Sequence, residues 1–227
     1  MVLPFLAPRW FFGYDIVLEL LFSIISFMVA MFAFKMYKKT SQKSVKLFGI
    51  SFLLIAISYL IQTLLNFMIL SKINEEISRM MKLYSISAFN YAGAMVHIFF
   101  MTLGLAILTY TILKTDSKRT FWLLIILPLL GVFLSANITT IFYLFATVFL
   151  IFIAGHYIGN CLRKKKGNSL LVGIAFMFLL LGNIHFLFLQ NHAIFYVLGH
   201  ILEFFAYLLI LINLISVSKW RKGKNLR

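Results

Sequence analysis

The last apolar segment of the chain reads HAIFYVLGHILEFFAYLLILINLISVSK from His192 to Lys219. It is longer than the roughly 20 apolar residues that a helix needs to cross a bilayer. Tyr196, His200, Glu203 and Tyr207 follow one another at i, i+4, i+7 and i+11, which places them on one helix face. A charge at the centre of a transmembrane helix costs about 2.5–3.5 kcal/mol on insertion scales. We therefore expect this face to point into a helical bundle that the rest of the chain supplies.

The composition indicates a multi-pass protein of the cell membrane. Of the 227 residues, 63% are hydrophobic and only 12% are charged, whereas about a quarter of the residues in a soluble domain are charged. The net charge of +15 does not indicate nucleic-acid binding, because the basic residues lie in connections between apolar segments. The single Cys161 excludes an internal disulfide bond, and we expect no signal peptide at the N-terminus. The abundance of Phe, Ile, Leu and Lys favours a prokaryotic source.

Seven apolar segments predict an all-α fold, a polytopic bundle of seven transmembrane helices that forms a single domain, 1–227. The predicted spans are 12–37, 46–70, 84–113, 120–137, 139–162, 168–190 and 192–218. With seven crossings, every lysine and arginine except Arg9, Lys72, Arg79 and Lys82 falls on one side of the membrane. Because basic residues accumulate on the cytoplasmic side, this distribution predicts an N-terminus outside the cell and a cytoplasmic C-terminus.

The polar residues within the predicted spans gather at one depth. They come from five helices and lie in the outer half of the bilayer, where polar side chains of neighbouring helices compensate one another better than lipid does. Glu19 lies one turn deeper than Asp15, so we expect it to have a buried partner. These residues predict an outer-half polar cavity that binds a small ligand, with the following candidates: Asp15, Glu19, Gln62, Asn66, Asn90, His97, Asn183, His185, Tyr196, His200 and Glu203.

Structural roles are an alternative for several of these positions. Asp15 also fits a carboxylate in the first turn of a helix, where the helix dipole favours a negative charge. His200 and Glu203 also fit a hydrogen-bonded pair that locks helix packing. The small residues Gly155 and Gly159 are typical of close contacts between helices.

The last span has no lysine before Lys219, which argues against a microbial rhodopsin despite the seven predicted spans. Three further chemistries stay open for the histidines and carboxylates. Haem b needs two facing histidines, which His97 and His200 supply, with His185 as a spare. A zinc site with an open position would use His97, His185, His200 and Glu203. Either cofactor would make the protein an oxidoreductase or a hydrolase, although no nucleophile–base pair is visible. A proton-coupled transporter would use the same groups as relays, although no matching pair of Gly/Pro-interrupted helices supports it.

The stretch FYVLGHILEFFAYLLILINLI resembles the last helix of membrane-integral sensor modules of the MASE type. The resemblance covers some 25 residues, mainly Gly199, His200 and the aromatic–aliphatic pattern around them. It implies a sensor whose histidine-bearing helix passes a signal onward. Because no output domain follows Lys219, the resemblance implies a separate cytoplasmic signalling partner.

We therefore expect a non-enzymatic, sensor-like membrane module that binds a small-molecule ligand, a metal ion or protons in its outer half. Histidine and carboxylate together would make such a site sensitive to pH. The haem- or metal-binding enzyme is the first alternative, and the proton-coupled transporter is the second.

Overall fold

The protein is all-α in its computed structural model, which describes residues 8, 10–11, 13–73, 79–113, 115–164, 167–188 and 192–224. Side chains are described for these residues except within 69–90, 164–169 and 217–224. No strand occurs in the described ranges, which confirms that the fold is all-α. The helices are α1 Tyr14–Thr40, α2 Lys43–Ile73, α3 Arg79–Leu113, α4 Lys118–Phe133, α5 Ile138–Lys164, α6 Gly167–Leu187 and α7 Ile194–Lys224.

Six of these helices, α1, α2, α3, α5, α6 and α7, are long and apolar enough to cross a membrane, as in a multi-pass membrane protein. The exception is α4, which has 16 residues. At 1.5 Å per residue it is about 24 Å long, whereas the hydrocarbon core of a bilayer is about 30 Å thick. The helix observed here is shorter than the predicted span 120–137, because it ends at Phe133. The chain then turns before Asn137, whose backbone N–H donates to Ser135 Oγ at 3.0 Å.

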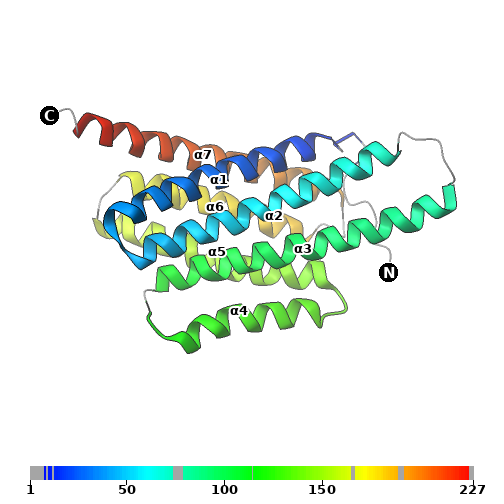
Figure 1. Ribbon diagram of the computed structural model, residues 1–227, viewed down its shortest axis with the longest axis horizontal. Helices are drawn as coiled ribbons and strands as arrows, with labels where there is room; N and C mark the ends of the chain where they lie inside the picture. The colour runs from blue at the N-terminus through cyan, green and yellow to red at the C-terminus, as the bar shows by residue number, and fades with distance from the viewer. Residues whose placement is uncertain are drawn as a thin grey trace.

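Six helices close a ring in the order α1, α2, α3, α5, α6 and α7, since each packs against the next and α7 packs back against α1. Among the described elements, α4 contacts only α3 and α5, and it lies at the edge of the bundle (Figure 1). Consecutive helices run antiparallel (Figure 1). The end of the bundle at which α1 begins is called the N-terminal end below.

Apolar side chains fill the interior of the ring and cover much of its outside. Phe22, Leu108 and Ile153 are completely buried, at 0% exposure. Ile24 and Met31 on α1 are among many large apolar side chains that are exposed. Such an apolar exterior suits contact with the lipid of a bilayer.

Glycines allow the closest approach between α6 and α7. A Cβ atom added at Gly182 would lie 2.9 Å from the carbonyl oxygen of Gly199, so the two backbones are in contact there. The expected close-packing role of Gly155 and Gly159 is wrong, because a Cβ at either position would meet nothing within 4 Å. Small residues mark close packing only where another helix faces them.

Candidate functional site

Asp15 ties the start of α1 to α7. One carboxylate oxygen accepts hydrogen bonds from the backbone N–H groups of Gly13 and Ile16, both at 2.8 Å. The other accepts from the hydroxyl of Tyr196 at 3.2 Å. Asp15 is 1% exposed. It lies in the first turn of α1, as its alternative structural role predicted, and its side chain accepts backbone hydrogen bonds there. It also forms a buried link between α1 and α7.

Glu19 has the buried partner that its position predicted. The side-chain amide of Asn66 on α2 donates to both carboxylate oxygens, at 3.0 and 3.2 Å. Glu19 is 3% exposed and Asn66 is 7% exposed. The pair therefore links α1 to α2 one turn deeper than the link from Asp15 to α7.

His200 and Glu203 form the third part of the site, on α7. Nδ1 of His200 lies 3.4 Å from Oε2 of Glu203, but the geometry is not that of a hydrogen bond, and neither atom has a hydrogen-bond partner among the described residues. The other oxygen of Glu203 accepts from the hydroxyl of Tyr59 at 3.1 Å. This arrangement leaves a buried ring nitrogen and a buried carboxylate oxygen in contact without a hydrogen bond.

Aromatic rings enclose the imidazole of His200, which is 5% exposed. Its ring centroid lies 4.4 Å from that of Tyr196 and 5.2 Å from that of Phe186. Phe11 and Phe22 stack on it at 6.0 and 6.5 Å. These rings exclude bulk water and strengthen every electrostatic interaction of the imidazole.

We call Asp15, Glu19, His200 and Glu203 the carboxylate–histidine cluster. It contains three carboxylates and one imidazole, and no Lys or Arg side chain among the described residues forms an ion pair with it. Hydrogen-bond donors from Tyr59, Asn66 and Tyr196 stabilise the carboxylates instead. A buried charge that lacks an opposite charge is destabilising, so the cluster is suited to take up a positive charge.

His97 lies beside the cluster but serves mainly to join α2 to α3. Its Nδ1 is 2.9 Å from Ser58 Oγ, and this hydroxyl donates to the His97 carbonyl oxygen at 2.7 Å. The ring packs edge-on against Tyr59 at 5.7 Å and Phe142 at 6.2 Å. His97 therefore contacts Tyr59, whose hydroxyl donates to Glu203 of the cluster.

Two other candidates at the same depth point elsewhere. Asn183 on α6 donates to the carbonyl oxygen of Tyr143 at 2.9 Å and to Thr147 Oγ1 at 2.6 Å, so it joins α6 to α5. Nδ1 of His185 donates to the carbonyl oxygen of Leu181, four residues earlier, at 2.7 Å. Both side chains are satisfied by neighbours outside the cluster.

The two remaining candidates lie in the half of the bundle nearer its N-terminal end. Gln62 is half-buried on α2, one turn before Asn66. Asn90 lies on α3, and its side chain falls outside the described residues. Tyr59 was not among the predicted residues, although it lies seven residues before Asn66 and thus on the same helix face.

The metal-binding alternative required His97, His185, His200 and Glu203 to converge. In the described part of the chain, no three His, Cys, Asp or Glu side chains form a group that could hold a metal ion, whereas zinc needs at least three protein ligands. Tyr59 contacts His97, and Phe22 contacts both Tyr59 and His200. A haem held by these two histidines would therefore have to replace close-packed aromatic rings.

Comparisons of this chain with protein-family models, with curated proteins and with solved structures found no match. The resemblance of α7 to sensor modules of the MASE type therefore stays a prediction from the sequence.

Proposed function

We propose that this protein is a non-enzymatic, sensor-like membrane module that responds to protons bound by the carboxylate–histidine cluster. The proposal rests on the buried contact at 3.4 Å between Nδ1 of His200 and Oε2 of Glu203, two atoms without a hydrogen bond to any described residue. A small side-chain movement would bring them to hydrogen-bond distance around a shared proton. Because imidazole is the side chain that changes its charge between pH 5 and 8, this pair is suited to report pH.

Two features favour a proton over a metal ion or a larger ligand. The described residues offer no set of three metal-ligating side chains at the cluster. The donors Tyr59, Asn66 and Tyr196 already contact the carboxylates at distances of 3.1, 3.0 and 3.2 Å. A larger ligand would have to break these hydrogen bonds, whereas a proton adds to the cluster without displacing any of them.

The position of the cluster offers a route for a signal. It joins α7 to α1 and α2, and the contact of α1 with α7 closes the ring of six helices. A change of charge at His200 and Glu203 would favour one arrangement of this seam over another. From the seam α7 continues to Lys224 at the opposite end of the bundle, where a cytoplasmic partner would detect the change.

The proposal includes seven crossings, with the N-terminus outside. If α4 did not cross, the basic residues after it would lie on the side opposite to those between α1 and α2, against the usual distribution of positive charge. Single cysteines at Ser41 and Ala136, introduced in a Cys161→Ser background, distinguish the two topologies. Seven crossings predict that a membrane-impermeant thiol reagent reaches them from opposite sides, and labelling from the same side would contradict them.

The proton proposal is tested on the purified protein in mild detergent, by thermal unfolding between pH 5 and 8. We expect the melting temperature to change with pH in the wild type, and Glu203→Gln and His200→Gln to remove a large part of this change. His185→Gln is the matched control, since that imidazole lies at the same depth but contacts the backbone of Leu181. Equal pH dependence in all four proteins would contradict the proposal.

A second assay separates the sensor from the transporter. In vesicles carrying a pH gradient and a pH-sensitive dye, the sensor leaves the gradient intact. Dissipation of the gradient by the wild type but not by Glu203→Gln would instead identify a proton pathway and would contradict the sensor proposal.

A further inference from the structure

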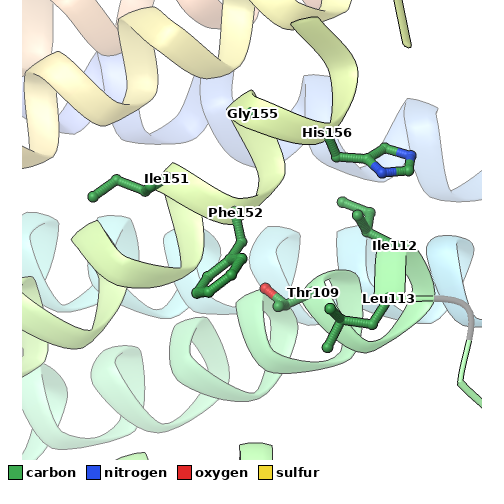
Figure 2. A pocket seen from close by; sticks show the side chains of 7 residues that line it. All are labelled: Thr109, Ile112, Leu113, Ile151, Phe152, Gly155 and His156. Atoms are coloured by element: carbon green, nitrogen blue, oxygen red, sulfur yellow. The ribbon is translucent and has the colours of Figure 1, made fainter. Parts of the chain in front are cut away.

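A second feature of the molecule is a cavity of about 410 Å³ between α3 and α5. It lies in the half of the bundle where both helices end, away from the carboxylate–histidine cluster. Its α3 wall consists of Thr109, Ile112 and Leu113, from the last turns of that helix (Figure 2). The volume falls in the range of about 300–1,000 Å³ that is typical of small-molecule sites.

The α5 wall makes the cavity apolar and opens it toward the membrane. Ile151 and Phe152 line it and are also exposed on the surface of the bundle. Gly155 leaves a gap in this wall, since a Cβ atom there would meet nothing within 4 Å. Both α3 and α5 are long and apolar enough to span a bilayer, so the surface onto which the cavity opens is one that lipid chains would contact.

Thr109 places an unsatisfied hydroxyl in this apolar wall. It is 2% exposed, and its Oγ1 has no hydrogen-bond partner among the described residues. Helical threonines commonly donate to the carbonyl oxygen one turn earlier, as Thr111 does to Ile107 at 2.8 Å. Figure 2 shows the hydroxyl of Thr109 directed across the gap toward Phe152. A carbonyl oxygen of a ligand would satisfy this buried donor.

The cavity becomes more polar toward the end of the bundle. His156 lies one turn beyond Phe152 on α5, and the side-chain amide of Asn160 holds its Nε2 at 2.7 Å. Exposed basic side chains lie beyond it, at the start of α4 and near the end of α5: Lys118, Arg119 and Arg163. Along α5 the order from the middle of the bundle to its end is therefore apolar, imidazole and cation, while on α3 the apolar Ile112 and Leu113 follow the hydroxyl of Thr109.

We infer that this cavity binds one acyl chain of an anionic glycerophospholipid from the surrounding bilayer. The chain lies against Ile151 and Phe152, an ester carbonyl oxygen accepts from Thr109, and the phosphate lies toward His156 and the basic residues. One helical turn, about 5.4 Å, separates the level of Phe152 from that of His156, which suits the short distance between the ester and the phosphate of such a lipid. The site is independent of the proton response proposed above.

The test is native mass spectrometry of the full chain in detergent, titrated with a phosphatidylglycerol or with a phosphatidylcholine of the same chains. We expect one phosphatidylglycerol to bind tightly and phosphatidylcholine to bind at least about tenfold more weakly. Gly155→Leu fills the gap and should abolish this tight binding. Gly159→Leu is the matched control, because it also enters open space on α5 but does not line the cavity.

A second pair of variants tests the hydroxyl. Thr109→Val should weaken phosphatidylglycerol binding about threefold to tenfold, the effect of one hydrogen bond. Thr111→Val, which removes only a bond to its own helix, should bind like the wild type. Equal binding by Gly155→Leu and Gly159→Leu would overturn the site, and equal binding of the two lipids would overturn the anionic headgroup. Photocrosslinking from position 151 to the bound lipid provides a measurement that does not depend on variant stability, and its absence would also overturn the site.

Discussion

Nδ1 of His200 and Oε2 of Glu203 lie 3.4 Å apart on α7, one helical turn from each other. Tyr59 satisfies only the other carboxylate oxygen of Glu203. In the tautomer that carries its proton on Nε2, the neutral imidazole presents an acceptor to this carboxylate oxygen and forms no hydrogen bond with it, whereas one added proton on Nδ1 would make the contact a hydrogen-bonded ion pair. The proposed response to protons therefore centres on this contact.

We expect Tyr196→Phe to loosen the junction of α1 with α7. The substitution removes the donor to a buried oxygen of Asp15, and an unsatisfied buried acceptor costs about 1–3 kcal/mol. Unfolding of the purified protein by a denaturing detergent measures the loss. Tyr14→Phe, at an exposed position, is the control, and equal stability of the two variants would show that the hydroxyl of Tyr196 contributes nothing.

Substitutions of Glu19 and Asn66 should have non-additive effects on the free energy of unfolding. Asn66→Leu leaves Glu19 buried without its donor, which we expect to destabilise the protein by about 1–3 kcal/mol or more. Replacing both residues with Leu removes both polar groups, so the double variant should recover much of that loss. Gln62→Leu, one turn away on α2, should show no coupling to Glu19. If the changes in free energy of unfolding of the two single Leu variants add up to that of the double variant, the hydrogen bond between Glu19 and Asn66 is contradicted.

Two glycine-to-alanine substitutions should differ in their effect on the free energy of unfolding. Gly182→Ala places a Cβ atom 2.9 Å from the carbonyl oxygen of Gly199, so α6 and α7 must separate, at a cost of about 1–3 kcal/mol. Gly155→Ala enters open space and should be neutral or stabilising by up to about 1 kcal/mol, because alanine favours a helix. Thermal unfolding of both variants checks this prediction, and a change of the same sign and size in both would refute it.

A substitution at Asn183 should lower the stability of the protein without changing the pH dependence of its melting temperature. Asn183→Leu breaks its hydrogen bonds to Tyr143 and Thr147, so we expect a loss of about 1–3 kcal/mol of stability. The pH dependence of the melting temperature should stay that of the wild type, because Asn183 does not contact the carboxylate–histidine cluster. In His200→Gln, by contrast, we expect the melting temperature to depend less on pH than in the wild type. A change of pH dependence in Asn183→Leu would mean that the responsive site extends to α5.

Much of the fold was predictable because a membrane restricts the possible structures. Apolar length predicts helices, since a helix satisfies its own backbone hydrogen bonds in lipid, and the described helices lie where the apolar segments predicted them. The short α4 is the exception, because its apolar run continues beyond Phe133 into a turn. The spacing of glycines also gave a wrong prediction at Gly155, which has no close neighbour. Close packing needs another helix facing the glycine, and the sequence does not reveal which helix faces it.

The candidate site was predictable in depth but not in its contacts. Sequence position determined how far each polar residue lies along its helix, and spacing placed Tyr196, His200 and Glu203 on one face of α7. The same information placed Asn183 at that depth, yet its side chain binds α5. Tyr59 went unnoticed although it binds Glu203 directly.

The sequence by itself therefore determined the helices, their alternating directions and the depth at which the polar residues gather. Only the tertiary structure decided that α1 and α7 form the carboxylate–histidine cluster with hydrogen-bond donors from α2, while Asn183 and His185 turn away from it. The physical reason is that helical periodicity sets the height and the face of each residue on its own helix. The order of the helices in the ring and the rotation of each one depend on packing between segments that are distant in the chain.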